Sequence, residues 1–137
     1  MDLFPYIPLP IRDKNNNIVQ IFKPMVVVRL CFKHKLSPYP FSCLLDSGSD
    51  MNLFPSCFAQ NIGIKLEDGE EIKIRGIGDI EIKAYRHKVQ LYLDKKHFET
   101  TIDFSNYQQF ALLGRNGFFN HFNQVIFKEK EKIVELH

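Results

Sequence analysis

Residues 43–50 read CLLDSGSD, an apolar strand segment that runs directly into a carboxylate and a turn. Two leucines suited to a buried strand lead directly into the carboxylate of Asp46. Gly48 allows a sharp turn because it has no Cβ, and the hydroxyls of Ser47 and Ser49 can bond the nearby main chain. A carboxylate held on a rigid turn is suited to acid–base chemistry. Asp-Ser-Gly by itself is also an ordinary turn sequence, so the interpretation depends on the rest of the chain.

Length and composition indicate one globular domain, residues 1–137. Apolar residues make up 45% and charged residues 25%, a balance that allows a normal core. The net charge of +2 is too small to indicate a nucleic-acid partner. The apolar runs are too short to span a membrane, and the first residues lack the features of a signal peptide.

The chain contains three cysteines and no Cys-x-x-Cys pair. An odd number of isolated thiols is typical of reduced cysteines, so we expect a cytoplasmic protein. The five histidines show no metal-ligand spacing, and we expect neither a metal nor a cofactor.

Short, evenly spaced β-type segments predict an all-β, small closed barrel with one or two short helices. Residues 7–11 and 18–22 flank the turn sequence DKNNN and should form a hairpin. A proline in the first turn and Gly63 just past the end predict a helix over residues 55–62. The other expected strands, read from apolar alternation, are 25–32, 41–45, 51–54, 72–74, 80–84, 89–93, 100–104, 110–113, 125–127 and 133–136.

Two further motifs follow the DSG triplet in a fixed order. Residues 74–79 read IRGIGD, a glycine-flanked hairpin tip, and residues 111–116 read ALLGRN. Together the three motifs resemble those of the retropepsin-like (retroviral-type) aspartic proteases, over roughly residues 41–127. The N-terminal residues 1–24 lie outside the resemblance and form an extension that is atypical of the family.

The resemblance implies a role for each matching residue. Asp46 corresponds to the catalytic aspartate, and Ser47, Gly48 and Ser49 continue its active-site loop. Leu113 and Gly114 belong to the closing motif. The remaining matches are an ion pair of Asp50 with Arg115, and a substrate-covering flap formed by Arg75, Gly76, Ile77 and Gly78, with Arg75 where viral flaps commonly have glycine.

An aspartic protease needs two carboxylates, and this chain has a single Asp-Ser/Thr-Gly triplet. The resemblance therefore implies an aspartic endopeptidase that acts on peptides as a homodimer, with one Asp46 from each copy. We expect the apolar end segments to contribute to the interface. The candidate residues there are Leu3, Phe4, Tyr6, Val134 and Leu136.

Alternatives remain open at this stage. Asp50 and Arg115 could be an incidental surface pair, and the glycine-flanked tip could be an ordinary turn. The whole chain could also be a catalytically inactive member of the same fold that serves as a dimerisation or peptide-binding module, because fold does not fix function.

Overall fold

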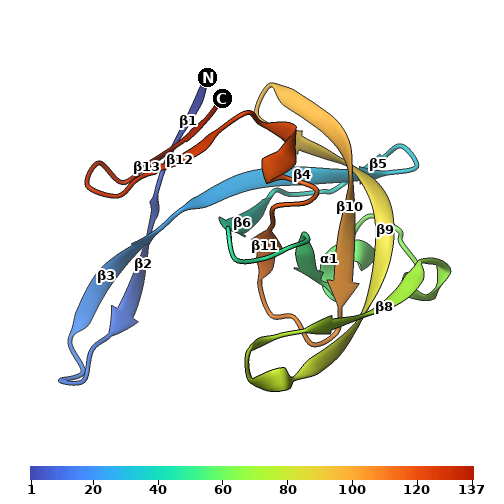
Figure 1. Ribbon diagram of the computed structural model, residues 1–137, viewed down its shortest axis with the longest axis horizontal. Coiled ribbons are helices and arrows are strands. Elements are labelled where there is room, and N and C mark those ends of the chain that lie inside the picture. The colour runs from blue at the N-terminus through green and yellow to red at the C-terminus, as the bar shows by residue number, and fades with distance from the viewer.

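A computed structural model describes residues 1–137 and is almost entirely β-structure (Figure 1). It has a single α-helix, α1 (Ser56–Gln60), and three short 3-10 turns, Leu66–Asp68, Ile77–Asp79 and Phe119–His121. The strands are β1 (Asp2–Pro5), β2 (Ile7–Arg12), β3 (Ile18–Lys23), β4 (Met25–Phe32), β5 (Lys35–Leu36), β6 (Phe41–Leu45), β7 (Leu53–Pro55), β8 (Glu70–Arg75), β9 (Glu81–Leu93), β10 (Lys96–Ser105), β11 (Ala111–Leu113), β12 (Val125–Lys128) and β13 (Ile133–Leu136).

Six strands close into a barrel in the order β4-β6-β11-β7-β10-β9, because β9 also pairs with β4. The β6–β11 and β7–β10 pairs are parallel, and the other ladders of the barrel are antiparallel. The closed all-β barrel predicted from the sequence is therefore confirmed. Strand β6, which ends just before Asp46, therefore has a neighbouring strand on each side, β4 and β11.

Alternation of side chains along the strands builds the core. In β4, Val26, Val28 and Leu30 are buried while the residues between them are half-buried or exposed, as expected for a strand with one covered face. Helix α1 covers one end of the barrel, and the ring of its Phe58 stacks on Phe41 with centroids 4.2 Å apart. The helix lies within the predicted range 55–62.

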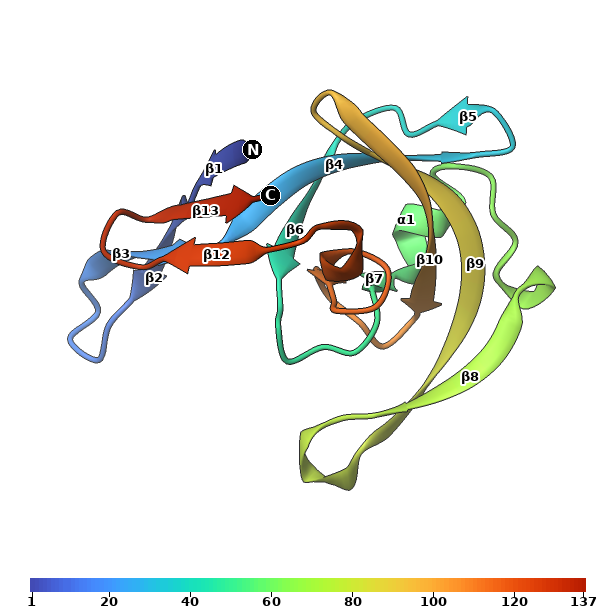
Figure 2. The ribbon, with the colours of Figure 1, turned by 45° about the horizontal axis from the view of Figure 1, so that its top comes forward.

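Several boundaries differ from those predicted. The expected strands 80–84 and 89–93 are parts of one continuous strand, β9, which bends from the barrel into the β8–β9 hairpin (Figure 2). Phe110 was expected in a buried strand, but β11 begins at the next residue and Phe110 is 56% exposed. The short strand β5 lies between the expected strands 25–32 and 41–45, where no strand was predicted.

A buried charge pair joins β9 to β10. Asp103 is fully buried, and both of its carboxylate oxygens accept hydrogen bonds from Arg86, at 2.8 and 3.1 Å. The two residues face each other in the β9–β10 register, and the hydrogen bonds to Asp103 raise the pKa of Arg86. A buried carboxylate without such a partner would be strongly destabilising.

The two ends of the chain form a sheet of their own, in the order β1-β13-β12. This sheet buries Tyr6, Val134 and Leu136 within a single chain. These three residues were predicted to lie at an interface between two copies. Because they are already covered within one chain, that prediction is wrong for them. Leu3 remains 53% exposed, and Phe4 is half-buried against the core.

None of the helices has the length and apolar character needed to cross a membrane.

The terminal sheet predicts a specific loss of stability in acid. Glu135, whose side chain is 11% exposed, accepts hydrogen bonds from Lys128 and His137, and these bonds lower its pKa from the ordinary value of 4.5. The lowered pKa means that the folded protein stabilises the ionised form of Glu135. This stabilisation is present above the ordinary pKa of 4.5 and is lost as the pH falls through the folded-state pKa.

We therefore expect the free energy of unfolding to fall less between about pH 7 and about pH 3 in Glu135→Gln than in wild type. Denaturant titration across that range measures the difference. Glu131→Gln, which removes a longer contact with Lys128 at 4.0 Å, is the control and should retain the wild-type slope. Equal slopes for all three proteins would contradict the prediction.

Candidate active site

Asp46 lies immediately after the end of β6, in the loop that continues from that strand (Figure 1). Its main-chain N–H donates to the carbonyl of Leu113 in the neighbouring strand β11, at 3.0 Å. Its own carbonyl accepts a hydrogen bond from the N–H of Ser49, at 3.1 Å, which closes a tight turn. The α-carbon of Asp46 is therefore fixed to the barrel at the point where the chain leaves the sheet.

The carboxylate of Asp46 is oriented by the loop that it begins. Its Oδ1 accepts the N–H of Gly48 at 2.9 Å, and the side chain is half-buried. A Cβ at position 48 would lie 3.3 Å from that same oxygen, a distance tighter than ordinary van der Waals contact. Glycine therefore leaves the carboxylate room to approach the main chain, with Oδ2 directed to no protein donor.

The two serines of the loop have different surroundings. The hydroxyl of Ser49 donates to the carbonyl of Met51 at 2.7 Å and so closes the second half of the loop. Ser47 is exposed and makes no side-chain hydrogen bond within the chain. Only Ser49 has a structural role inside a single copy.

Asn52 organises the site, although the sequence analysis did not identify it. Its side chain is fully buried, accepts the N–H of Gly114 at 2.9 Å and donates to the carbonyl of Thr101 at 3.1 Å. Its main-chain carbonyl accepts the N–H of Asp103 at 2.9 Å. A lone asparagine inside the apolar run 51–55 was the signal available, because a buried amide must find partners.

Gly114 allows two motifs of the site, residues 43–50 and residues 111–116, to come into contact. A Cβ there would lie 2.4 Å from the carbonyl oxygen of Met51 and 2.8 Å from that of Ser49. The glycine is therefore needed for the close approach of residues 113–116 to the Asp46 loop. The preceding residue, Leu113, is fully buried.

The predicted ion pair between Asp50 and Arg115 is not formed within the chain. Both side chains are exposed. The main chain connects the same two segments instead: Arg115 N–H donates to the carbonyl of Ser49 at 2.9 Å, and Asn116 N–H donates to that of Asp50 at 2.8 Å. The Asp46 loop and residues 113–116 are therefore joined, as the resemblance implied, but by main-chain hydrogen bonds in place of the predicted ion pair.

The residues 75–78 form the tip of the β8–β9 hairpin. The guanidinium of Arg75 pairs with Asp79 at 3.3 Å and with Glu81 at 3.9 Å. Gly78 adopts a left-handed conformation with φ +79°, which favours glycine. Ile77 is fully exposed. A charged base therefore carries an apolar residue at the far end of the hairpin.

No group of three or more His, Cys, Asp or Glu side chains is arranged to hold a metal ion. Cys43 is buried beneath the Asp46 loop, and burial raises the pKa of its thiol. Cys57 is exposed on α1.

The close contact at Gly114 can be tested with a matched pair of glycine substitutions. Gly114→Ala should lower the free energy of unfolding by about 1–3 kcal/mol, because the added methyl overlaps main-chain atoms that cannot move independently. Gly76→Ala is the control, since the nearest atom would be 3.9 Å away. Chemical denaturation measures both; equal stabilities of the two variants would contradict this account of Gly114.

Comparison with known proteins agrees with this arrangement. No protein-family model and no curated protein matches the sequence. Among solved structures, the chain is similar to the EIAV protease, a retroviral enzyme solved in complex with the inhibitor HBY-793, with a TM-score of 0.53 and 19% identity. The match covers 68% of this chain and 82% of that one. The chain therefore has the retropepsin-like fold, a mostly β barrel with one short helix.

Proposed function

We propose that residues 1–137 form one domain of an aspartic endopeptidase in which two copies of the chain each supply an Asp46 carboxylate. The observation that supports this proposal best is the placement of Asp46. Its carboxylate is held by the Gly48 amide at the end of a central barrel strand, with Oδ2 unpartnered. A single such triplet per chain requires a second copy, related by a two-fold axis, to complete the pair.

Two carboxylates brought together acquire different protonation states. At about 3 Å and an effective dielectric of roughly 20, two negative charges repel by roughly 5 kcal/mol. One carboxyl therefore remains protonated while the other is ionised. The ionised carboxylate takes a proton from a water molecule whose oxygen attacks the peptide carbonyl, and the protonated carboxyl donates to the carbonyl oxygen. The carboxyl that took the proton from water then donates it to the leaving nitrogen, a hydroxyl of the tetrahedral diol returns a proton to the other carboxylate, and the amine is released.

The β8–β9 hairpin is suited to act as a flap over the bound peptide. Its tip residues Gly76 and Gly78 flank Ile77, whose side chain is left entirely to solvent in a single chain. Closing such a tip over a substrate would exclude water from the reacting groups. Arg75 pairs with Asp79 and Glu81 at the base of the tip, and because these pairs are exposed they leave the tip free to move.

The substrate class is a peptide or protein, and dimer contacts would come from the loop 46–50 and the hairpin tip. The end strands would contribute less than the apolar ends of the sequence predicted, because β1, β12 and β13 pair within one chain. Three free cysteines support a reducing, cytoplasmic location.

Asp46→Asn should reduce peptide cleavage by at least about a thousandfold while the protein remains folded, because the amide cannot accept the proton of the attacking water. Incubation with a peptide library, read by mass spectrometry, measures the loss. Asp94→Asn makes the same charge change in the exposed β9–β10 turn and should keep wild-type activity. Cleavage retained in a clean preparation of Asp46→Asn would reject the assignment.

Cleavage should also depend on assembly. Specific activity should fall on dilution, because the total cleavage rate approaches a second-order dependence on protein concentration below the dimer dissociation constant. Excess Asp46→Asn should inhibit wild type by forming heterodimers with one carboxylate. Activity strictly proportional to concentration, down to a species that sedimentation identifies as a monomer, would refute the two-copy mechanism. A dimer without cleavage would favour the peptide-binding module instead.

A further inference from the structure

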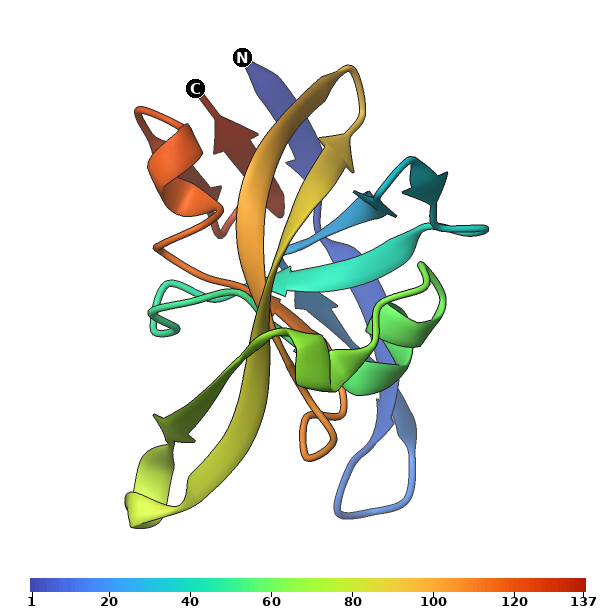
Figure 3. The same cartoon turned by 90° about the vertical axis from the view of Figure 1, so that its right-hand side faces the viewer.

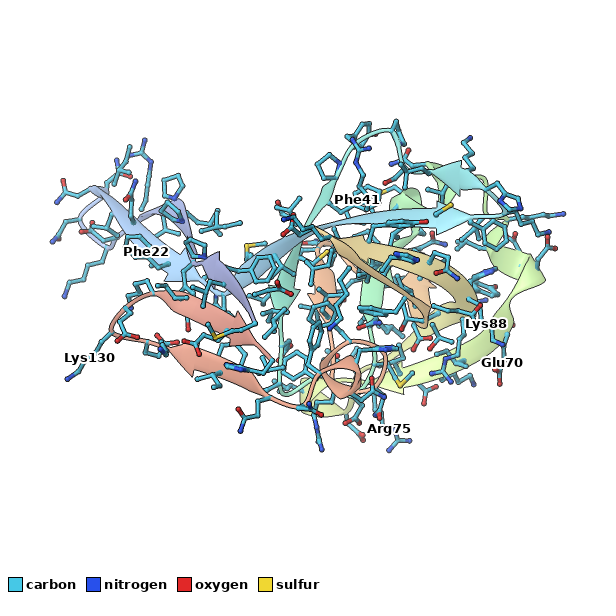
Figure 4. All side chains as sticks on the ribbon, turned by 90° about the horizontal axis from the view of Figure 1, so that it is seen from above. Phe22, Phe41, Glu70, Arg75, Lys88 and Lys130 are labelled. Carbon is cyan, nitrogen blue, oxygen red and sulfur yellow. The ribbon has the colours of Figure 1, made fainter.

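The β2–β3 hairpin has no partner in the chain. It forms a separate two-stranded sheet that projects from the barrel, and in Figure 3 its tip lies at the lower right while the tip of the β8–β9 hairpin lies at the lower left. Figure 4 shows Phe22 on this hairpin, well away from Phe41 of the barrel. An isolated two-stranded hairpin is marginally stable in water. Its large apolar side chains are nevertheless exposed: Ile11 by 42%, Ile18 by 65%, Val19 by 39% and Phe22 by 45%.

The pairing register shows which main-chain groups of the hairpin are free. The N–H of Asp13 donates to the carbonyl of Asn17, so this pair is hydrogen-bonded. Hydrogen-bonded pairs alternate with pairs whose N–H and C=O groups point away from the partner strand. In the observed register, the outward-facing pairs are Pro8 with Phe22, Pro10 with Gln20 and Arg12 with Ile18.

The two edges of the hairpin therefore differ. On the outer edge of β2, Pro8 and Pro10 replace two of the outward N–H groups, and proline at such positions prevents further strand pairing. The outer edge of β3 carries no proline. It presents the main-chain N–H and C=O groups of Ile18, Gln20 and Phe22 to solvent, flanked by apolar side chains.

We propose that β3 pairs with β3 of a second copy of this chain, antiparallel and centred on Gln20 opposite Gln20 of the second copy. In this register Ile18 lies opposite Phe22 in both directions, which gives three hydrogen-bonded pairs. The product is a four-stranded sheet in the order β2-β3-β3-β2. Both of its outer edges are then β2 edges blocked by proline, so the pairing stops at two copies.

The residues of β3 favour a second copy over an unrelated peptide. Gln20 is the one uncharged polar side chain in the strand IVQIFK, and an amide can both donate to and accept from an identical amide. Lys23 would face Asn17 of the second copy, so no like charges meet. Moving the centre to residue 21 would place Pro24 opposite Ile18 and lose a donor.

This contact goes beyond the proposed peptidase function, because it involves neither Asp46 nor the β8–β9 hairpin. It lies in the N-terminal extension, and it assigns that extension a role in self-association. The contact would exist whether or not the chain cleaves peptides.

A single proline can block strand pairing at the outer edge of β3. Gln20→Pro removes one outward N–H and leaves the hydrogen bonds inside the hairpin, whereas Arg12→Pro makes the same change on the β2 edge that is already blocked. Sedimentation of the full chain over a range of concentrations should show that Gln20→Pro dissociates at concentrations at least about tenfold higher than wild type. Arg12→Pro should behave as wild type. Identical distributions for wild type and Gln20→Pro would overturn the proposal.

A cysteine pair provides a test that does not depend on proline being tolerated. Opposed residues in a hydrogen-bonded antiparallel pair have α-carbons about 5.5 Å apart, which a disulfide can bridge. Under mild oxidation, Gln20→Cys should form a disulfide between copies, and Arg12→Cys should form none beyond the wild-type background. Equal crosslinking of the two variants would reject the register. Peptide cleavage measured in parallel separates the two proposals. If Gln20→Cys crosslinks but no peptide is cleaved, the result counts against the peptidase and not against the β3–β3 contact.

Discussion

The site depends on the main-chain contact between the Asp46 loop and the segment 113–116. Peptide groups of Asp46, Arg115 and Asn116 donate across this contact, and the buried amide of Asn52 completes it by accepting from Gly114. These bonds join segments that are more than sixty residues apart in the chain. Because each donor and acceptor is a peptide or buried amide group, the loop is fixed with little help from charged side chains. The exposed positions of Asp50 and Arg115 are consistent with this, since exposed ion pairs add little stability.

The candidate site combines a loop that is fixed to the barrel with a hairpin that protrudes from it. The Asp46 loop belongs to the closed barrel, where every strand has a neighbour on both sides. The β8–β9 hairpin leaves the barrel and ends in a fully exposed isoleucine. An apolar residue without cover in one chain is suited to contact a substrate or a second copy. In the proposed reaction, the barrel would hold the carboxylate and the hairpin would cover the bound peptide.

The chain ends also affect how copies can associate. The sheet β1-β13-β12 satisfies the terminal strands internally and buries Val134 and Leu136. Several exposed apolar side chains lie on the β2–β3 hairpin, of which only one edge carries prolines. Self-association through that hairpin and assembly of two Asp46 loops are separate events with separate physical requirements, and each can be tested without the other.

The sequence by itself determined the strands with clear alternation, the helix after Pro55, the DKNNN hairpin and the closed all-β class. These features follow from local rules: side-chain period, turn chemistry and the position of glycine and proline. The sequence also predicted that the motifs around Asp46 and Gly114 would meet. Only the tertiary structure decided how they meet, because a main-chain hydrogen bond leaves no trace in the identity of the residue that makes it. The role of Asn52, the unpaired Asp50 and Arg115, the burial of Asp103 beside Arg86 and the internal pairing of the chain ends all depend on contacts between distant segments, which local patterns do not encode.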